Sequence, residues 1–266
     1  MQSTAIAGTP RPSQDRAPHP STTPNGSRDS LIIIPTYDEA GNLEALVPTI
    51  LAAGPFDILV IDDNSPDGTG RIADELASRY PTRVDVVHRP GKLGLGSAYV
   101  AGFGYALARG YERIFEMDAD FSHDPATLST LQAALDDADV VIGSRYVPGG
   151  GSPGWPVWRR LLSRAGSAYA ARVLDLPFRD LTSGFKGFRR HALAALDLGS
   201  VRSNGYSFQV EMTYRCYRNG FAVAEVPIVF HQRRQGRSKL VPYIVIEALL
   251  VVWRLRRGAP EAEART

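Results

Sequence analysis

Little cysteine, little net charge and no long apolar run characterise this 266-residue sequence. Its one cysteine, Cys216, excludes an internal disulfide and is typical of a reducing compartment. A formal net charge of +2 is too small to predict nucleic acid as a partner. Hydrophobic residues make up 44% of the chain, which is enough for the core of one large α/β domain or two small ones.

The two ends of the chain differ from its middle. Residues 1–28 hold five prolines among Ser, Thr and Gly and no apolar run, so they predict a disordered tail and no signal peptide. Residues 241–257 are apolar and then basic, and too short to span a bilayer, which takes about 20 apolar residues. They predict an amphipathic helix at a membrane surface or docked on a membrane partner, with a last core helix as the equal alternative. Residues 258–266 are a second predicted tail, which leaves 29–240 as the folded domain.

Between the ends, short apolar runs alternate with amphipathic segments. Each run suits a buried parallel strand, and each segment repeats apolar residues as one face of a helix does. Strands are predicted at 31–34, 58–61, 84–88, 114–117, 140–142 and 222–230, and helices at 43–51, 69–80, 97–108, after Pro125, at 158–169 and at 208–218. This order predicts an open, mostly parallel sheet covered by helices on both faces.

Acidic residues follow three of these strands, at the end where ligands collect in open α/β sheets. They are Asp38 and Glu39 after the first strand, Asp62 and Asp63 after the second, and Asp118 and Asp120 after the fourth. One acidic strand end is often only a helix cap, but three in one sheet predict a shared site.

The pair Asp118 and Asp120 predicts a metal at this site. In an extended chain, residues two apart project to the same side, so both carboxylates would face one point. Mg²⁺ or Mn²⁺ takes such oxygen ligands while it keeps waters and binds phosphates. A metal there would stabilise a diphosphate as a leaving group. His123 lies near the pair, but Asp124-Pro125 after it suggests a helix start, which favours a structural role for the histidine.

The same edge offers groups for a nucleotide. Asp63 could accept hydrogen bonds from a base or ribose, and Tyr37 offers a face on which a base could stack. The glycine-rich loop 91–96, which carries Lys92, precedes a helix whose N-terminus favours anions. It is neither a dinucleotide fingerprint, since Tyr99 stands at the third glycine position, nor a P-loop, since its lysine comes too early. A dehydrogenase is therefore disfavoured.

Basic residues complete the pattern late in the chain. Arg145 follows the fifth strand, a helix after the glycine-rich segment 149–154 carries three arginines, and four basic residues crowd into 233–239. Those two groups are Arg159, Arg160 and Arg164, and Arg233, Arg234, Arg237 and Lys239. A reaction between a diphosphate donor and a second anion needs cations to hold both, and arginine does so bidentately. The last group comes just before the apolar helix, where lipid phosphates would lie.

Together these motifs resemble family 2 glycosyltransferases, which share the Rossmann-like GT-A fold, and within them the polyprenol (dolichol) phosphate mannose synthases. The resemblance runs from about residue 31 to residue 239. Its carriers are Pro-Thr-Tyr-Asp-Glu-Ala-Gly-Asn at 35–42, Asp-Asp-Asn-Ser-Pro-Asp-Gly-Thr at 62–69, Lys-Leu-Gly-Leu-Gly at 92–96, Met-Asp-Ala-Asp at 117–120, Gly-Ser-Arg-Tyr at 143–146, Ser-Gly-Phe-Lys at 183–186 and Gly-Arg-Ser-Lys-Leu at 236–240.

The resemblance implies transfer of mannose from GDP-mannose to polyprenyl phosphate, with inversion and with Mg²⁺ or Mn²⁺, at the cytoplasmic face of a membrane. By motif, the guanosine would be held by Pro35, Tyr37, Glu39, Ile61 and Asp63, and the metal and diphosphate by Asp118 and Asp120 with a backbone contact from Ala119. Arg145, Arg233 and Lys239 would contact donor phosphates or sugar, Arg164 the lipid phosphate, and Gln209 the acceptor side. The family often has Gln at the position of Ser122, which puts a third protein ligand to the metal in doubt.

Other functions remain open at this point. A UDP-glucose-dependent polyprenyl phosphate glucosyltransferase, or another family 2 enzyme with a non-lipid acceptor, would carry nearly the same motifs. A nonenzymatic nucleotide-binding adaptor is disfavoured, because both Asp118 and Asp120 are present. No membrane-spanning segment follows Lys239, so an integral membrane partner or direct lipid contact would have to bring the protein to its acceptor. Loop 146–156 could close over a bound donor, because its glycines allow movement.

Overall fold

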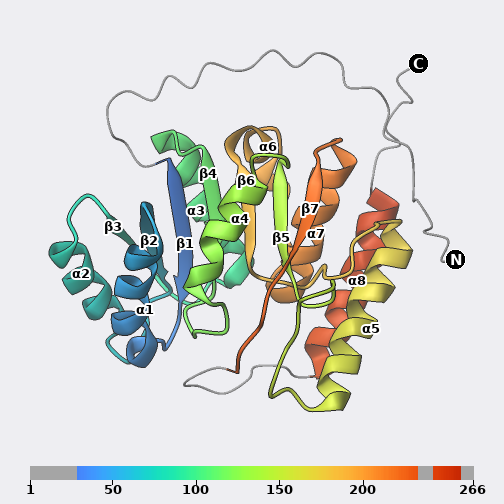
Figure 1. Ribbon diagram of the computed structural model, residues 1–266, viewed down its shortest axis with the longest axis horizontal. Coiled ribbons are helices and arrows are strands. Elements are labelled where there is room, and N and C mark those ends of the chain that lie inside the picture. The colour runs from blue at the N-terminus through green and yellow to red at the C-terminus, as the bar shows by residue number, and fades with distance from the viewer. Residues whose placement is uncertain (1–28, 233–241, 259–266) are drawn as a thin grey trace, which may run out of the picture.

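The computed structural model describes residues 29–232 and 242–258. The expectations for residues 1–28 and 259–266, and for Arg233 and Lys239, lie outside these residues. Gly258, expected to begin the C-terminal tail, is instead the last residue of a helix. Within them, seven strands form one sheet in the order β3-β2-β1-β4-β6-β5-β7 (Figure 1). Its strands are β1 (Ser30–Thr36), β2 (Phe56–Asp62), β3 (Val84–His88), β4 (Arg113–Glu116), β5 (Val140–Ser144), β6 (Lys186–Arg189) and β7 (Val223–Pro227).

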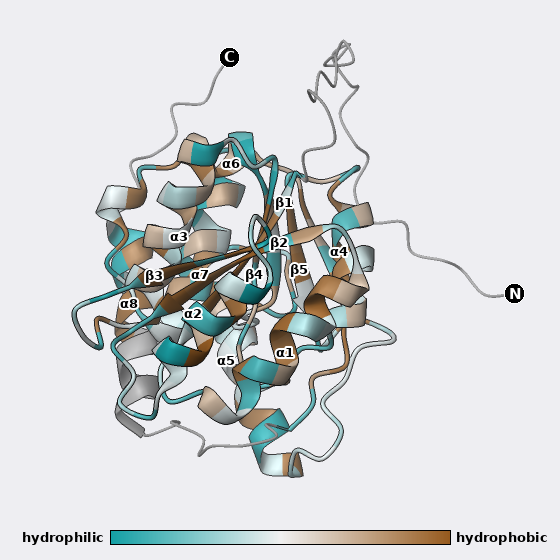
Figure 2. Ribbon diagram, turned by 90° about the vertical axis from the view of Figure 1, so that its left-hand side faces the viewer, coloured by the Kyte–Doolittle hydropathy of each residue, from teal (hydrophilic) through white to brown (hydrophobic). Residues whose placement is uncertain are grey.

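Helices cover both faces of this sheet, as predicted. They are α1 (Ala40–Ala53), α2 (Thr69–Arg79), α3 (Leu95–Arg109), α4 (Leu128–Ala134), α5 (Val157–Leu174), α6 (Arg190–Ala194), α7 (Gly205–Arg218) and α8 (Pro242–Gly258), with short 3-10 turns at Pro125–Thr127 and Leu198–Ser200. The apolar strands lie between the two helical layers (Figure 2).

Alternate residues of each central strand enter different cores. On β1, Ile32 and Ile34 pack with residues of α1, α2 and α4, whereas Leu31 and Ile33 pack with residues of α3, α6 and α7. Successive side chains of a strand point to opposite faces, so a strand buried on both sides must be apolar at every position. This is why the predicted strands read as unbroken apolar runs.

The sheet is mixed at one place. Strand β6 runs antiparallel to both its neighbours, β4 and β5, and the sequence patterns did not predict it. Its residues, Lys-Gly-Phe-Arg, show neither an apolar run nor an alternation that would mark a strand. The prediction for 222–230 was too long, because β7 ends at Pro227 and only an isolated bridge joins Val229 to Gly151.

Helices α5 and α8 pack together at the β7 end of the sheet (Figure 1). A third apolar cluster joins them to α7 and includes Ala170, Leu174, Val210 and Val252. Among the described residues, no helix has the length and apolar character needed to cross a membrane. Because Val252 is buried on the fold, α8 has a core-facing side, as the core-helix alternative expects.

Candidate active site

The sheet order brings the three acidic strand ends together. Strand β1 lies between β2 and β4 and is parallel to both, with Thr36 opposite Asp62 and Ile33 opposite Glu116. The carboxyl ends of these three strands therefore meet at one edge of the sheet. This confirms the shared edge that the sequence predicted.

The Asp-Asp-Asn-Ser-Pro-Asp-Gly-Thr segment shapes the loop after β1. Three successive backbone N–H groups of that loop donate to side chains of the segment: Asp38 N to Ser65 Oγ at 3.2 Å, Glu39 N to Thr69 Oγ1 at 3.0 Å and Ala40 N to Asp67 Oδ2 at 3.1 Å. Asp38 has a positive φ of 59°, a conformation that needs such support. Much of this motif thus serves to hold the turn that carries Tyr37 and Glu39.

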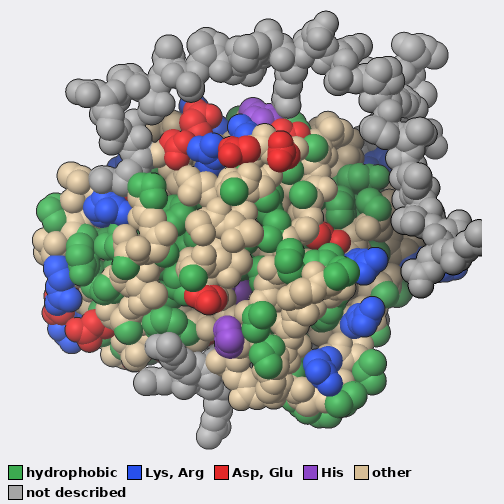
Figure 3. Space-filling model, in the orientation of Figure 1, with side chains coloured by type: hydrophobic (Ala, Val, Ile, Leu, Met, Phe, Trp, Pro, Cys, Tyr) green, Lys and Arg blue, Asp and Glu red, His purple; other side chains and the backbone are tan. Residues whose placement is uncertain are grey.

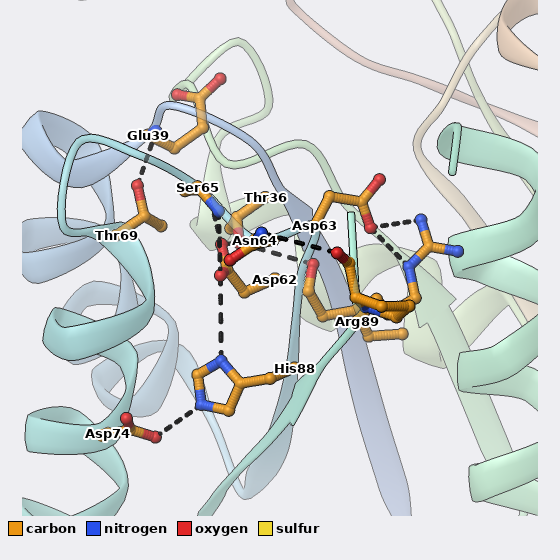
Figure 4. A network of polar contacts seen from close by, with 12 residues as sticks. Thr36, Glu39, Asp62, Asp63, Asn64, Ser65, Thr69, Asp74, His88 and Arg89 are labelled. Carbon is orange, nitrogen blue, oxygen red and sulfur yellow. Dashed lines mark hydrogen bonds and ion pairs between the residues drawn. The ribbon is translucent and has the colours of Figure 1, made fainter. Parts of the chain in front are cut away.

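Asp63 is bound within the protein itself. Its carboxylate pairs with the Arg89 guanidinium, and its Oδ2 also accepts a hydrogen bond from Leu93 N at 3.2 Å (Figure 4). Both side chains of the ion pair are 8% exposed. Arg89 further donates to Ser97 Oγ at 2.8 Å and to the Gly94 carbonyl at 3.0 Å. Asp63 therefore fixes the glycine-rich loop, and its predicted contact with a base or ribose stays a prediction.

The glycine-rich loop and Tyr37 lie against each other. The Lys92 ammonium is 3.9 Å from the centre of the Tyr37 ring, a cation–π contact on the face predicted to stack on a base. At the start of α3, Gly96 N donates to Asn204 Oδ1 at 3.2 Å. The side chain of Ile61 is fully buried in the core, whereas Pro35 and Glu39 remain partly exposed.

Asp118 lies just past β4 and Asp120 lies in the turn that follows (together, the acidic turn), so the pair does not stand in an extended strand as expected. Asp118 is partly exposed, whereas Asp120 is 2% exposed and its Oδ1 accepts from Ser122 N at 2.9 Å. The buried Ser122 Oγ has no hydrogen-bond partner among the described residues. Two carboxylates and a hydroxyl are an oxygen set that fits a hard divalent cation. In the described part of the chain there is no group of three or more His, Cys, Asp or Glu side chains that could hold a metal by itself.

His123 packs against this turn and bonds to its backbone. Its ring stacks on Phe185 at 4.7 Å, meets Phe230 edge-on at 5.4 Å, and accepts a hydrogen bond at Nδ1 from Asp118 N at 3.3 Å. Burial lowers the pKa of His123 below its usual value, so the neutral ring that can accept this bond is favoured. The geometry supports the structural role, with Asp118 as the residue it positions.

Two buried charged side chains next to this turn in the fold were not predicted. Glu116 and Lys186 are both fully buried, and the Lys186 ammonium donates to the Gln209 carbonyl at 2.6 Å. Burial raises the pKa of Glu116 and lowers that of Lys186, since each charge has lost its water. A methyl group added at Gly184 would lie 3.6 Å from Asp118 Oδ1 and 3.8 Å from Gln209 Nε2, so Gln209 reaches the acidic turn from α7.

Arg145 is held by an acid that the sequence patterns did not reveal. Its Nε and Nη2 donate to Asp180 Oδ2 and Oδ1, both at 2.7 Å, and Nη2 also donates to Thr182 Oγ1 at 2.8 Å. The Arg145 side chain is 4% exposed and that of Asp180 is fully buried. The guanidinium is thus oriented before any substrate arrives, and its predicted contact with donor phosphates stays a prediction.

Loop 146–156 is tied through Gly151 to the segment that follows β7. Gly151 N donates to the Ile228 carbonyl at 2.9 Å, and Phe230 N donates to the Gly151 carbonyl at 2.8 Å. Trp155 is buried and meets Phe230 edge-on at 5.2 Å. Closure of the whole loop over a donor would have to break these contacts. Arg164 lies farther along α5 and is exposed.

Some of the missed residues left a signal in the sequence. Arg89 directly follows β3, as Arg145 directly follows β5. Its position at a strand end therefore marked it as a candidate cation of the site in the same way. Glu116 is a charge inside an apolar strand, which marks a buried ionic group. Asp180 and Asn204 stand in loops, where no spacing predicts the partner that folding brings to them.

Comparison with known proteins agrees with this geometry. Residues 31–197 match the family model described as Glycosyl transferase family 2. Over 232 residues the chain is 50% identical to the polyprenol monophosphomannose synthase of Mycolicibacterium smegmatis, covering 85% of this chain and 87% of that protein. It is 48% identical to the undecaprenyl-phosphate mannosyltransferase of Micrococcus luteus, covering 84% of this chain and 92% of that protein.

More distant relatives extend the similarity. The dolichol-phosphate mannosyltransferase of Pyrococcus furiosus is 36% identical, with 87% of this chain and 65% of that protein covered. A solved structure of glucosyl-3-phosphoglycerate synthase from Mycobacterium tuberculosis, in complex with Mn²⁺, uridine diphosphate and glucosyl-3-phosphoglycerate, aligns with a TM-score of 0.64 at 20% identity, over 88% of this chain and 82% of that one. That likeness concerns the fold and confirms the predicted GT-A arrangement. The chain belongs to glycosyl transferase family 2.

Proposed function

We propose that this protein transfers mannose from GDP-mannose to a polyprenyl phosphate, with inversion at the anomeric carbon, giving polyprenyl phosphate mannose. The observation that carries the proposal is the acidic turn after β4, where Asp118 and the buried Asp120 are followed by a Ser122 hydroxyl that has no partner among the residues described. The names of the relatives at 48–50% identity support the sugar and the lipid acceptor.

Asp118, Asp120 and Ser122 would hold a Mg²⁺ or Mn²⁺ ion. Bound there, the ion would neutralise the diphosphate and ease its departure. Ser122 N, through its bond to Asp120, and His123, through its bond to Asp118 N, keep the two acidic residues in position. Tyr37 and Glu39 would meet the nucleoside on the loop that Ser65, Asp67 and Thr69 hold.

The acceptor supplies its own nucleophile. A phosphate monoester has a second pKa near 6, so it is already charged at neutral pH and needs no strong general base. The site has instead to align two anions and offset their charges. Arg145, oriented by Asp180, and Arg164 are the described cations proposed for this task, with Arg233 and Lys239 as further candidates.

The proposed place of action is the cytoplasmic face of a membrane. The lipid acceptor requires contact with a bilayer, and α8, with or without an integral membrane partner, would provide it. We propose residues 29–240 as the catalytic domain and 241–257 as the surface helix. Residues 1–28 and 258–266 would be tails.

A transfer assay tests the reaction. Radiolabelled GDP-mannose and UDP-glucose are offered in parallel, with polyprenyl phosphate vesicles and Mg²⁺ or Mn²⁺, and label in the lipid phase is counted. Label from GDP-mannose alone is the expected result. Label from UDP-glucose alone would overturn the sugar and keep the reaction type, and no lipid label from either would contradict the acceptor.

A further inference from the structure

Exposed apolar side chains gather on two helices. Of the ten large apolar side chains exposed in the described part of the chain, six belong to α5 or α8. They are Val157, Trp158, Leu161 and Leu162 on α5 and Leu250 and Trp253 on α8. These helices pack side by side at one end of the sheet, so the six side chains are carried by one helical pair (Figure 1). An apolar region of this kind marks an interaction surface.

A pocket of about 730 Å³ lies beside α5. Its wall contains Tyr146 and Phe178, its small side chains are Ala168 and Ala171, and Leu176 adds a further apolar group. Three arginines, Arg164, Arg172 and Arg179, line it against one carboxylate, that of Asp175. The pocket is thus partly apolar and carries a positive excess of two formal charges.

The pocket and part of the apolar surface share one face of α5. Val157, Leu161, Arg164, Ala168 and Arg172 follow one another at intervals of three or four residues, which places them on one side of a helix. Arginine and apolar side chains lie next to each other over this part of the molecule (Figure 3). A ligand in the pocket would therefore lie beside the exposed apolar residues of the first turns of α5.

We propose that this pocket binds the headgroup of an anionic phospholipid while the first turns of α5 contact the surrounding bilayer. A phosphodiester headgroup with glycerol attached offers both a charge for the arginine forks and apolar atoms for the aromatic and alanine wall. Arginine near an anionic membrane surface attracts it, and Trp and Leu side chains enter the interfacial layer. The proposal rests on the chain's working at a membrane, and it assigns to α5 a contact so far expected only of α8.

This headgroup site is separate from the acceptor site. Arg172 and Arg179 have no proposed part in sugar transfer, and only Arg164 is shared between the pocket and the proposed acceptor contact. Vesicles that contain phosphatidylglycerol but no polyprenyl phosphate therefore test phospholipid binding without the acceptor, and the variants below assign that binding to the pocket. A failure of the transfer assay would leave that result unaffected.

The experiment is co-sedimentation of the full-length chain with phosphatidylcholine vesicles, with and without phosphatidylglycerol. The wild type is expected to bind the anionic vesicles preferentially. The double variant Arg172→Glu/Arg179→Glu should lose about tenfold or more of this binding, because two attractive charges become repulsive. Its matched control is Arg71→Glu/Arg79→Glu, the same change of net charge on exposed positions of α2, at the opposite end of the sheet (Figure 1).

A second variant separates the effect of the pocket on vesicle binding from the effect of net charge. Ala168→Phe fills the pocket without altering any charge, and severalfold weaker binding to anionic vesicles is expected. Undiminished binding by this variant, or an equal loss in the α2 control, would overturn the proposal. So would normal vesicle binding by the arginine double variant together with a raised KM for polyprenyl phosphate, because the pocket would then serve the acceptor. Circular dichroism of each variant verifies that it is folded, independently of any nucleotide binding.

Discussion

Arg89 joins two parts of the candidate site that come from different elements. It follows β3, pairs with Asp63 after β2, and holds Ser97 and the Gly94 carbonyl at the start of α3. The loop between them carries Lys92, whose ammonium lies on Tyr37. The Arg89 guanidinium therefore positions the glycine-rich loop beside Tyr37, where the nucleoside is proposed to bind, although Arg89 has no proposed contact with the donor.

Arg89→Lys keeps the charge but loses the planar fork that bonds three partners at once. We expect the KM for GDP-mannose to rise about tenfold, with a much smaller change in kcat, because the loop loses bonds that each contribute about 1 kcal/mol. The matched control is Arg83→Lys, at the other end of β3, where Arg83 bonds the carbonyls of Gly54 and Phe56. That variant should lose stability without a change in KM. Equal effects on KM from both would contradict a positioning role for Arg89.

Asp120 is the residue on which the proposed metal depends most. Asp120→Asn retains the shape of the side chain and the bond from Ser122 N while removing the charge, so transfer should fall on the order of 100-fold or more. The chain should remain folded, as circular dichroism would verify. Asp137→Asn, at an exposed position before β5, is the control and should leave activity unchanged. Near-normal turnover by Asp120→Asn would remove the metal assignment.

His123 predicts the direction of an effect of pH on stability. Burial lowers its folded-state pKa below the unfolded value of about 6.5, so in acid the unfolded chain binds a proton that the folded chain refuses. This contribution to stability is fully present above about pH 6.5 and is lost as the pH falls below it. His123→Gln should therefore lose less of its free energy of unfolding than the wild type between about pH 7.5 and pH 5, measured by urea denaturation. The control His231→Gln, with an exposed side chain, should follow the wild type; the same pH dependence in His123→Gln would contradict the assignment.

At the scale of elements, α3 meets the segment before α7 through a glycine. A Cβ on Gly96 would lie 2.2 Å from the backbone oxygen of Ser203, so no side chain fits without moving one of the two segments. Gly104, on the same helix, has nothing within 4 Å of the position of an added Cβ. We expect Gly96→Ala to lower the free energy of unfolding by about 1–3 kcal/mol and Gly104→Ala to raise it by about 0.5–1 kcal/mol. Urea denaturation of both variants measures this, and a gain of stability in Gly96→Ala like that expected of Gly104→Ala would show that the contact at Gly96 is not tight.

The elements that sequence patterns could predict are those whose burial has a period. Strands β1 and β2 are buried on both faces and so appear as apolar runs, and α1 repeats Leu43, Leu46, Val47 and Ile50 toward one core. Strand β6 could not be found this way, because the burial of Lys186 and Gly187 follows no period. Lys186 is buried opposite a charged residue of the neighbouring strand, and Gly187 is buried where there is no room for a side chain. Lys186 faces Glu116, and a Cβ on Gly187 would lie 2.7 Å from the Phe115 ring.

For the candidate site, too, the sequence could predict what depends on local patterns but not which distant residues would pair. Local motifs identified the acidic turn and the loop after β1, since each lies within a few residues of a strand end. The pairs Arg89–Asp63 and Arg145–Asp180 were out of reach, because their members are 26 and 35 residues apart and meet only in the folded sheet. Roles proposed for Pro35, Ile61, Ala119 and Gln209 remain predictions about a bound donor or acceptor.

At the scale of the whole molecule, the sheet divides the proposed work between its two ends. The loop proposed to meet the nucleoside lies at the ends of β1, β2 and β3, and the acidic turn follows β4 at the centre of the sheet. Helices α5 and α8 lie beyond β5 and β7 (Figure 1). Both helices carry exposed apolar residues, and α5 also lines the pocket with its arginines. A soluble donor and a lipid acceptor would thus approach from different sides and meet at Asp118 and Asp120.

This division predicts that donor binding requires the metal but not the membrane. GDP with Mn²⁺ should stabilise the purified chain in the absence of lipid, by about 2.7 kcal/mol at a hundredfold excess over Kd, which appears as a rise in Tm. The rise should vanish with EDTA and in Asp120→Asn, because both remove the charge that offsets the diphosphate. UDP with Mn²⁺ should produce a smaller rise if the loop of Tyr37 and Glu39 discriminates the base. A rise of equal size with EDTA present would mean that the diphosphate is held by arginines alone, and the acidic turn would then need another role.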